Sequence, residues 1–131
     1  MRMNGDVLLD TSAVIQLIAE DPLAVGLVAS NPGIYVSFIT LGELLYGAEK
    51  SERPQENIAD IKTFTSAFSL LPCDKETAGH YGYLANVLRK KGRPIPQNDI
   101  WIAAVARQHD LIVATWDKHF QQVPEISVYS W

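Results

Sequence analysis

Four acidic residues stand beside apolar segments of this sequence: Asp10, Glu43, Asp99 and Asp117. Carboxylates within about 4–6 Å of one another repel, so a cluster of them needs a cation or retains a proton at a raised pKa. Hard oxygen ligands of this kind suit Mg²⁺ or Mn²⁺, and such an ion activates a bound water and stabilises charge on phosphate oxygens. If the four side chains converge, they indicate metal-dependent hydrolysis of a phosphodiester.

Each acid also has an ordinary structural interpretation. Asp99 stands where a helix N-cap is expected, Asp10 can cap the segment that follows it, and Asp117 has the character of a turn residue. Glu43 is harder to explain in this way, because leucines surround it and a solvated carboxylate is less expected there. The choice between scattered acids and one site depends on the elements that carry them.

Short apolar runs rich in β-branched or aromatic residues predict strands at residues 7–9, 34–38, 70–71, 111–114 and 126–129. Helical spacing of apolar residues between these runs predicts helices over residues 12–20, 40–50, 54–68, 74–92 and 98–109, the last of which opens at Asn98 or Asp99. Strands that are separated by helices indicate an α/β fold with a parallel sheet covered on both faces.

This fold places the four acids at one edge of the sheet. In open parallel sheets, ligands bind in the crevice beyond the carboxyl ends of the strands. Asp10 directly follows the first predicted strand, and Asp117 comes shortly after the fourth. Asp99 opens the helix that leads into the fourth strand, and Glu43 lies one turn into the helix after the second. We therefore expect all four carboxylates to converge on one crevice.

Four motifs around these acids resemble those of the PIN-domain nucleases, and most closely the VapC-type toxins of bacterial toxin–antitoxin pairs. They are VLLDTSAVI at residues 7–15, SFITLGELLYGA at 37–48, PQNDIWIAA at 96–104 and VATWDKHF at 113–120. Each motif alone is weakly specific, whereas four in the same order and at similar separations over almost the whole chain are a strong signal.

The resemblance implies a three-layer α/β/α sandwich with a central, mainly parallel sheet, in which residues 1–131 form a single nuclease domain. It implies an endoribonuclease that depends on Mg²⁺ or Mn²⁺, with the four acids as both the catalytic and the metal-binding residues. Thr115 is carried over as a catalytic neighbour that positions acids or water, and Thr11 as a similar polar group. The Thr115 hydroxyl has the alternative of capping the turn around Asp117.

Partners also follow from the resemblance: an RNA substrate, a homodimer, and a cognate antitoxin whose C-terminal segment lies across the protein and reaches the site. Candidates for an apolar groove are Tyr46, Leu45 and the stripe Ile58, Ile61 and Phe64. Packing in the core is the more ordinary interpretation for most of these side chains, and the sequence does not assign the groove.

Composition is that of an ordinary globular protein, with 131 residues, 47% of them hydrophobic and 20% charged. No apolar run approaches the roughly 18 residues of a membrane helix, and acids interrupt the first apolar stretch, so we expect a cytoplasmic protein without a signal peptide. The lone Cys73 excludes an internal disulfide, and we expect it in the core. A net charge of −4 lacks the basic footprint of nucleic-acid binding, but four clustered acids account for it.

Several other residues are weaker candidates. The basic residues at 89–93 suit either contact with RNA phosphates or a solvated helix end. His80, His109 and His119 are dispersed, and we interpret them as structural or surface residues, with His119 at a surface turn. Trp116, beside the fourth acid, retains a substrate role by stacking on a base.

Three rival functions share features with this sequence. A phosphatase of the haloacid-dehalogenase type also begins with a strand and an aspartate, but it needs a second aspartate where this chain has Ser12. A PIN-like module that binds without cutting stays open, although an unused cluster of like charges would be a cost to stability. A nuclease acting on DNA also stays open, because carboxylates act on phosphates and do not distinguish RNA from DNA.

Overall fold

Parallel strands form the centre of the computed structural model, which describes residue 3 and residues 5–131. The strands are β1 (Val7–Leu9), β2 (Ile34–Ser37), β3 (Ser69–Leu71), β4 (Ile112–Thr115) and β5 (Ser127–Ser130). They make one sheet in the order β3-β2-β1-β4-β5, and every pairing is parallel. The predicted parallel sheet is therefore confirmed, with the last strand at its edge.

The helices are α1 (Thr11–Ile18), α2 (Pro22–Ser30), α3 (Phe38–Glu49), α4 (Pro54–Thr65), α5 (Lys75–Lys90) and α6 (Gln97–His109), with a short 3-10 helix, η1, at Lys118–Gln122. The predicted strand at 34–38 is one residue too long, because Ser37 caps α3 and Phe38 is already helical. Helix α3 thus begins two residues earlier than expected, at the carboxyl end of β2.

Helix α2 is absent from the sequence prediction. Asp21 and Pro22 were interpreted as the stop of the preceding helix, whereas they start a new one: the Asp21 carboxylate accepts a hydrogen bond from the Ala24 amide, and Pro22 takes the first helical turn. The α2 residues are apolar on all sides and show no one-sided stripe, so the periodicity that indicates a helix was missing.

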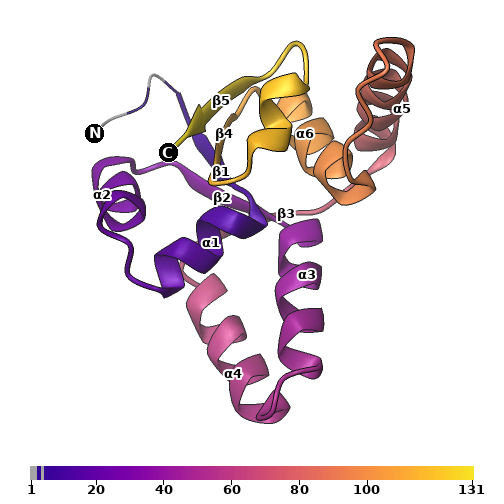
Figure 1. Ribbon diagram of the computed structural model, residues 1–131. Helices are drawn as coiled ribbons and strands as arrows, with labels where there is room; N and C mark the ends of the chain where they lie inside the picture. The colour runs from indigo at the N-terminus through magenta and orange to yellow at the C-terminus, as the bar shows by residue number, and fades with distance from the viewer. Residues whose placement is uncertain (1–2, 4) are drawn as a thin grey trace.

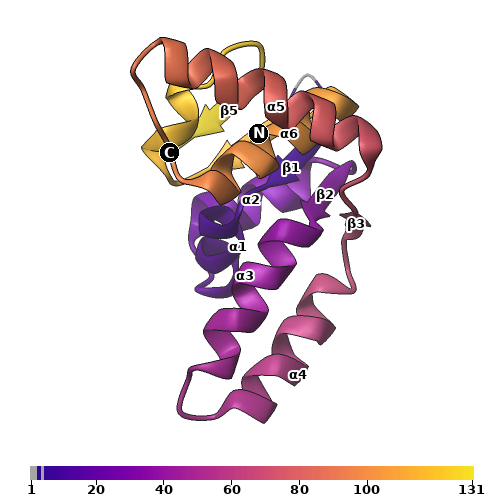
Figure 2. The ribbon, with the colours of Figure 1, turned by 90° about the vertical axis from the view of Figure 1, so that its right-hand side faces the viewer.

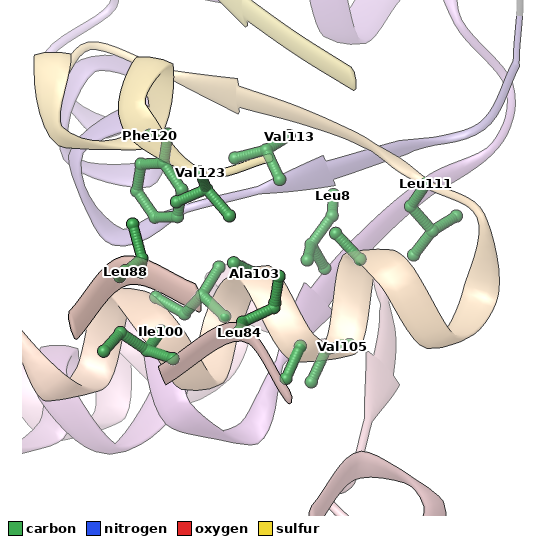
Figure 3. Packing of buried hydrophobic residues seen from close by; sticks show 13 residues of the cluster. Leu8, Leu84, Leu88, Ile100, Ala103, Val105, Leu111, Val113, Phe120 and Val123 are labelled. Carbon is green, nitrogen blue, oxygen red and sulfur yellow. The ribbon is translucent and has the colours of Figure 1, made fainter. Parts of the chain in front are cut away.

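Alternating side chains of β1 divide the core into two halves. Leu8 points to one face, where with Val113 it packs against Leu84 of α5 and Ala103 of α6 (Figure 3). Val7 and Leu9 point to the other face, against buried side chains of α1, α2 and α3. The result is the expected three-layer α/β/α sandwich, with α1 and α2 on one side of the sheet and α5 and α6 on the other (Figure 1). Helices α3 and α4 pack on each other and extend away from the sheet (Figure 2).

Two further expectations have an outcome in the fold. Cys73 is exposed in the segment between β3 and α5, so its expected place in the core is wrong; the chain crosses the surface there. Among the described residues, no single helix is both long enough and apolar enough to cross a membrane. Helices α1 and α2 meet the two criteria only when they are taken together, and they are bent by 106° relative to each other.

Candidate active site

Asp10 is the most buried of the four acids, at 3% exposure. It lies between the end of β1 and the start of α1, and its carboxylate caps that helix by accepting the Ala13 amide at 2.8 Å. Both Ser12 Oγ, at 2.8 Å, and Thr115 Oγ1, at 2.5 Å, donate to the same carboxylate. Burial raises the pKa of Asp10, and these hydrogen bonds oppose the increase. The capping role and a role in the site are thus compatible in this residue.

Thr115 joins two of the acids. Its fully buried hydroxyl, at the end of β4, donates to Asp10 and accepts the backbone amide of Asp117 at 2.8 Å. Positioning an acid and capping the turn around Asp117, the two alternatives from the sequence, are therefore both properties of this one side chain. Ser12 has a similar place that the sequence analysis missed, because its hydroxyl also accepts the Trp116 amide at 2.8 Å.

Glu43 reaches the same edge from α3. The Thr11 hydroxyl donates to its Oε1 at 2.5 Å, and the side-chain amide of Asn98 donates to its Oε2 at 3.4 Å. Helix α3 starts where it does because Ser37 Oγ accepts the Thr40 amide at 3.2 Å. Glu43 is thereby tied to α1 and to the first turn of α6, the elements that carry Asp10 and Asp99.

Asp99 lies in the first turn of α6 but does not cap it. The N-cap position is Pro96, which makes no side-chain cap, so the capping interpretation of Asp99 is wrong. Its side chain is 15% exposed, and its Oδ2 lies 3.3 Å from Nδ1 of His119. Asp117 instead caps η1, by accepting the His119 amide at 2.9 Å.

His119 was expected at a surface turn, and its ring does lie on the surface, but it is directed at the acids. Its Nδ1 is 2.9 Å from Oδ1 of Asp117 in addition to its approach to Asp99. The ligand atoms of Asp99, Asp117 and His119 all lie within 4.8 Å of one another. The available sequence signal was the position two residues after Asp117, and it was passed over because no second histidine lies at metal-ligand spacing.

The electrostatics support a single cluster, which we call the acidic site (Asp10, Glu43, Asp99 and Asp117). Burial raises the pKa of Asp99 most, the charges of Asp117, Asp10 and Glu43 add to the increase, and His119 opposes it, so that the pKa is about 6. Among the described residues, no lysine or arginine forms an ion pair with these acids. A protonated His119 would offset part of this negative charge, and the several hard oxygen donors that remain are a donor set that fits a divalent ion.

An apolar groove begins beside the acidic site. This α1–α4 groove has a volume of about 460 Å³ and runs from Thr11 and Glu43 along Ile15, Ile18, Ile61 and Phe64. Ile61 and Phe64 were predicted as groove candidates, and they also pack on the core below. Tyr46, 67% exposed, lines a separate depression with Phe38 and Lys50, and Leu45 and Ile58 are half-buried.

The remaining candidates lie outside this cluster. Residues 89–93 are exposed at the end of α5, which is consistent with a solvated helix terminus. Trp101 is half-buried and stacks on Tyr81, with ring centroids 4.0 Å apart. Trp116 is 55% exposed next to Asp117, so its ring is available to a ligand of the acidic site.

Comparisons with known proteins show the family of this chain. The model of the PIN domain matches residues 7–126. The chain is 40% identical over 127 residues to Ribonuclease VapC2 of Haemophilus influenzae, and 36% identical over 127 residues to the tRNA(fMet)-specific endonuclease VapC of Shigella flexneri; each alignment covers 95% of this chain and 96% of the relative. Among solved structures, VapBC-5 from Mycobacterium tuberculosis, a member of the VapBC family of toxin–antitoxin systems, is similar with a TM-score of 0.78 and 26% identity, over 97% of this chain and 99% of that chain.

Proposed function

The chain belongs to the PIN-domain family, and from this premise we propose that it is a divalent-metal-dependent endoribonuclease and the toxin of a toxin–antitoxin pair. The observation that carries the proposal is the gathering of four carboxylates at one edge of the sheet, where the half-buried Asp99 has its pKa raised to about 6 by burial and by the three neighbouring acids. A protein keeps such an unfavourable arrangement where a ligand compensates it, and the relatives that share almost the whole chain are named ribonucleases.

Asp10, Glu43, Asp99 and Asp117 would hold the metal, which we propose to be Mg²⁺ or Mn²⁺. When bound, such an ion supplies an activated water and stabilisation of charge on the phosphate oxygens. The protein contributes the fixed positions of the ligands. Asp10 is held by its cap and by the Thr115 hydroxyl, and Asp99 has to release any proton that it carries before it can bind a cation.

The hydroxyl groups act as positioning residues in this proposal. Thr115 holds Asp10 and the backbone of Asp117 at once, so it fixes the position of the Asp10 carboxylate relative to the turn that follows β4. Thr11 holds one oxygen of Glu43 and leaves the other to the weaker contact with Asn98. Small errors in these separations are costly for a metal site, because ligand geometry is tightly constrained.

RNA is the proposed substrate because relatives that align over 95% of this chain are named for it. The acids themselves do not distinguish the sugar of RNA from that of DNA. Trp116 supports an unpaired or loop region as the cleaved segment, since an exposed aromatic ring beside the site can stack on an unstacked base. The tRNA(fMet) named in the Shigella flexneri relative is the first defined RNA to test.

The α1–α4 groove supports a protein partner. Its apolar lining of Ile15, Ile18, Ile61 and Phe64 suits an apolar segment of an antitoxin, and its mouth is shared with Thr11 and Glu43 of the acidic site. A segment that lies in the groove therefore ends beside the acids and can exclude RNA from them. The homodimer and the single domain over residues 1–131 stay predictions, which light scattering and limited proteolysis would test.

The test is cleavage of total cellular RNA and of tRNA(fMet) by the purified, antitoxin-free protein. We expect discrete fragments with Mg²⁺ or Mn²⁺ that disappear with chelator and with Asp99→Asn. Cleavage that persists in chelator would contradict the metal-dependent site. Metal binding and RNA binding without cleavage of either substrate would favour the alternative of a binding module. Equal cleavage of single-stranded DNA would favour a nuclease that acts on DNA.

A further inference from the structure

His119 approaches the acidic site in a way that a surface turn does not require. Its Nδ1 lies 2.9 Å from one oxygen of Asp117 and 3.3 Å from one oxygen of Asp99. These two acids come from different elements, so the ring nitrogen is the point at which η1 and the start of α6 meet. A histidine that only ended a turn would have no reason to contact both carboxylates with the same nitrogen.

The backbone of His119 is fixed by a hydrogen bond to the residue two positions before it and by the burial of the residue that follows it. The His119 amide donates to Asp117, and the next residue, Phe120, is fully buried in the core. The ring itself is 46% exposed, so it is positioned from the backbone and not by tight packing of its own atoms. Such a side chain can adjust by a few tenths of an ångström at little cost, as a ligand has to do when an ion arrives.

The separations also match those of neighbouring ligands around one ion. In an octahedral site with bonds of about 2.1 Å, adjacent ligand atoms are about 3.0 Å apart. The nitrogen-to-oxygen distances of 2.9 and 3.3 Å agree with this edge length. Hydrogen bonds and ion pairs have similar lengths, so the alternative is that the His119 ring only donates a hydrogen bond to the Asp117 carboxylate.

We propose that His119 Nδ1 is a direct ligand of the metal held by Asp99 and Asp117, and that this nitrogen makes the site favour Mn²⁺ over Mg²⁺. The inference rests on the metal site of the proposed function and adds a fifth ligand of a different chemical kind. The ring's Nε2 is on the far side from the contact and can carry the proton, as a neutral imidazole ligand requires.

The preference follows from the donor atom. Mg²⁺ is a hard ion that prefers carboxylate and water oxygens. Mn²⁺ also suits oxygen ligands, but as a first-row transition ion it gains more affinity than Mg²⁺ from one imidazole nitrogen. Four carboxylates alone would serve both ions similarly. A nitrogen ligand adds affinity for the transition ion and adds little for Mg²⁺, so the ratio of the two affinities reports on His119.

The experiment is a metal titration of the purified protein, with pulsed electron paramagnetic resonance of bound Mn²⁺ as a direct readout of nitrogen coordination. We compare the natural chain with His119→Gln, which keeps a polar side chain without an imidazole, and with His109→Gln as the matched control. His109 is exposed at the other end of α6, about 15 Å along the helix from Asp99.

We expect nitrogen coupling to bound Mn²⁺ in the natural chain and in His109→Gln, and its loss in His119→Gln. The Mn²⁺ dissociation constant should rise about tenfold in His119→Gln, with the Mg²⁺ constant changed by less than about twofold. Circular dichroism of the metal-free variants checks that the fold is kept.

Two results would overturn the inference and separate it from the proposed function. Mn²⁺ that binds without nitrogen coupling, or a ratio of Mn²⁺ to Mg²⁺ affinity unchanged in His119→Gln, would leave the four-acid site intact and remove His119 from it. Absence of Mn²⁺ binding in the natural chain would overturn both the inference and the metal site beneath it.

Discussion

Helix α6 connects two clusters of charged residues that differ in how their charges are balanced. Its first turn carries Asp99 of the acidic site, and its last turn carries Arg107, about 12 Å further along the helix. Arg107 stacks on the Tyr83 ring, donates to Glu125 at 3.3 Å and lies 2.8 Å from Nδ1 of His80. We call these four residues, His80, Tyr83, Arg107 and Glu125, the Arg107 cluster.

Charges of opposite sign pair in the Arg107 cluster, whereas like charges gather in the acidic site and His119 offsets them only in part. A hydrogen bond from Tyr83 lowers the pKa of Glu125, and Arg107 lowers it further, whereas burial and like charges raise the pKa of Asp99. Compensated charges favour the folded chain by themselves, even if weakly at the surface. An excess of like charge opposes the folded state unless a ligand offsets it, so the contrast marks the acidic site as the candidate binding site.

The largest expected effect comes from removing a charge of the acidic site. Asp99→Asn should lower the rate of RNA cleavage about 10²–10³-fold while the fold is kept, because a charge that acts in the reaction is lost. Single-turnover cleavage with saturating Mn²⁺ measures it. Glu125→Gln, the matched change in the Arg107 cluster, should cleave like the natural chain, and full activity in Asp99→Asn would remove Asp99 from the site.

A smaller loss is expected when only the positioning of the acids is changed. Thr115→Val keeps the shape of the side chain but removes its hydrogen bonds to Asp10 and to the Asp117 amide. Cleavage and Mn²⁺ affinity should both fall about 10–100-fold, and Thr115→Ser should restore most of each. If the valine and serine variants had equal metal affinity, the hydroxyl would have no positioning role.

The stability of the metal-free protein should depend on pH through Asp99. Its pKa is about 6 in the folded chain against an ordinary 3.8, so the folded state binds the proton more tightly and this contribution to stability falls as pH rises from about 4 to about 6. With chelator at pH 7, Asp99→Asn should be more stable than the natural chain, on the order of 1–2 kcal/mol after allowance for solvent screening.

Urea denaturation at pH 5, 6 and 7, with chelator and with Mn²⁺, measures this effect. Mn²⁺ should stabilise the natural chain and have little effect on Asp99→Asn, because the ion supplies the missing compensation. An Asp99→Asn variant that is less stable than the natural chain in chelator would show that the Asp99 charge is already compensated within the protein.

The smallest effect is expected in the Arg107 cluster. Arg107→Met removes the ion pair with the half-exposed Glu125 and keeps an unbranched side chain over Tyr83. The midpoint of urea denaturation should fall only slightly, because solvent screens the exposed carboxylate, and cleavage should be unchanged. A loss of cleavage similar to that of Asp99→Asn would mean that the two clusters are coupled through α6, and the contrast between them would fail.

Features with a local cause were predictable. β1 was located to the residue because three apolar side chains precede a capping aspartate, and the start of α5 followed from Asp74, whose carboxylate caps the helix at the Thr77 amide. The errors also have local causes. The uniform apolarity of α2 left no helical stripe, and Cys73 was assigned to the core from its residue type, although it lies in a surface connection.

The order of the strands and of the helices other than α2 was determined by the sequence alone, as was the placement of the acids at strand ends and helix starts. Apolar periodicity and helix caps act between residues close in the chain. Tertiary structure decided which of these acids lie close together and which side chains contact them. The Thr115 hydroxyl meets Asp10 across 105 positions of sequence, and His119 meets Asp99 from another element. Burial and distance set the raised pKa of Asp99, and both exist only once β1, β4 and α6 are packed together.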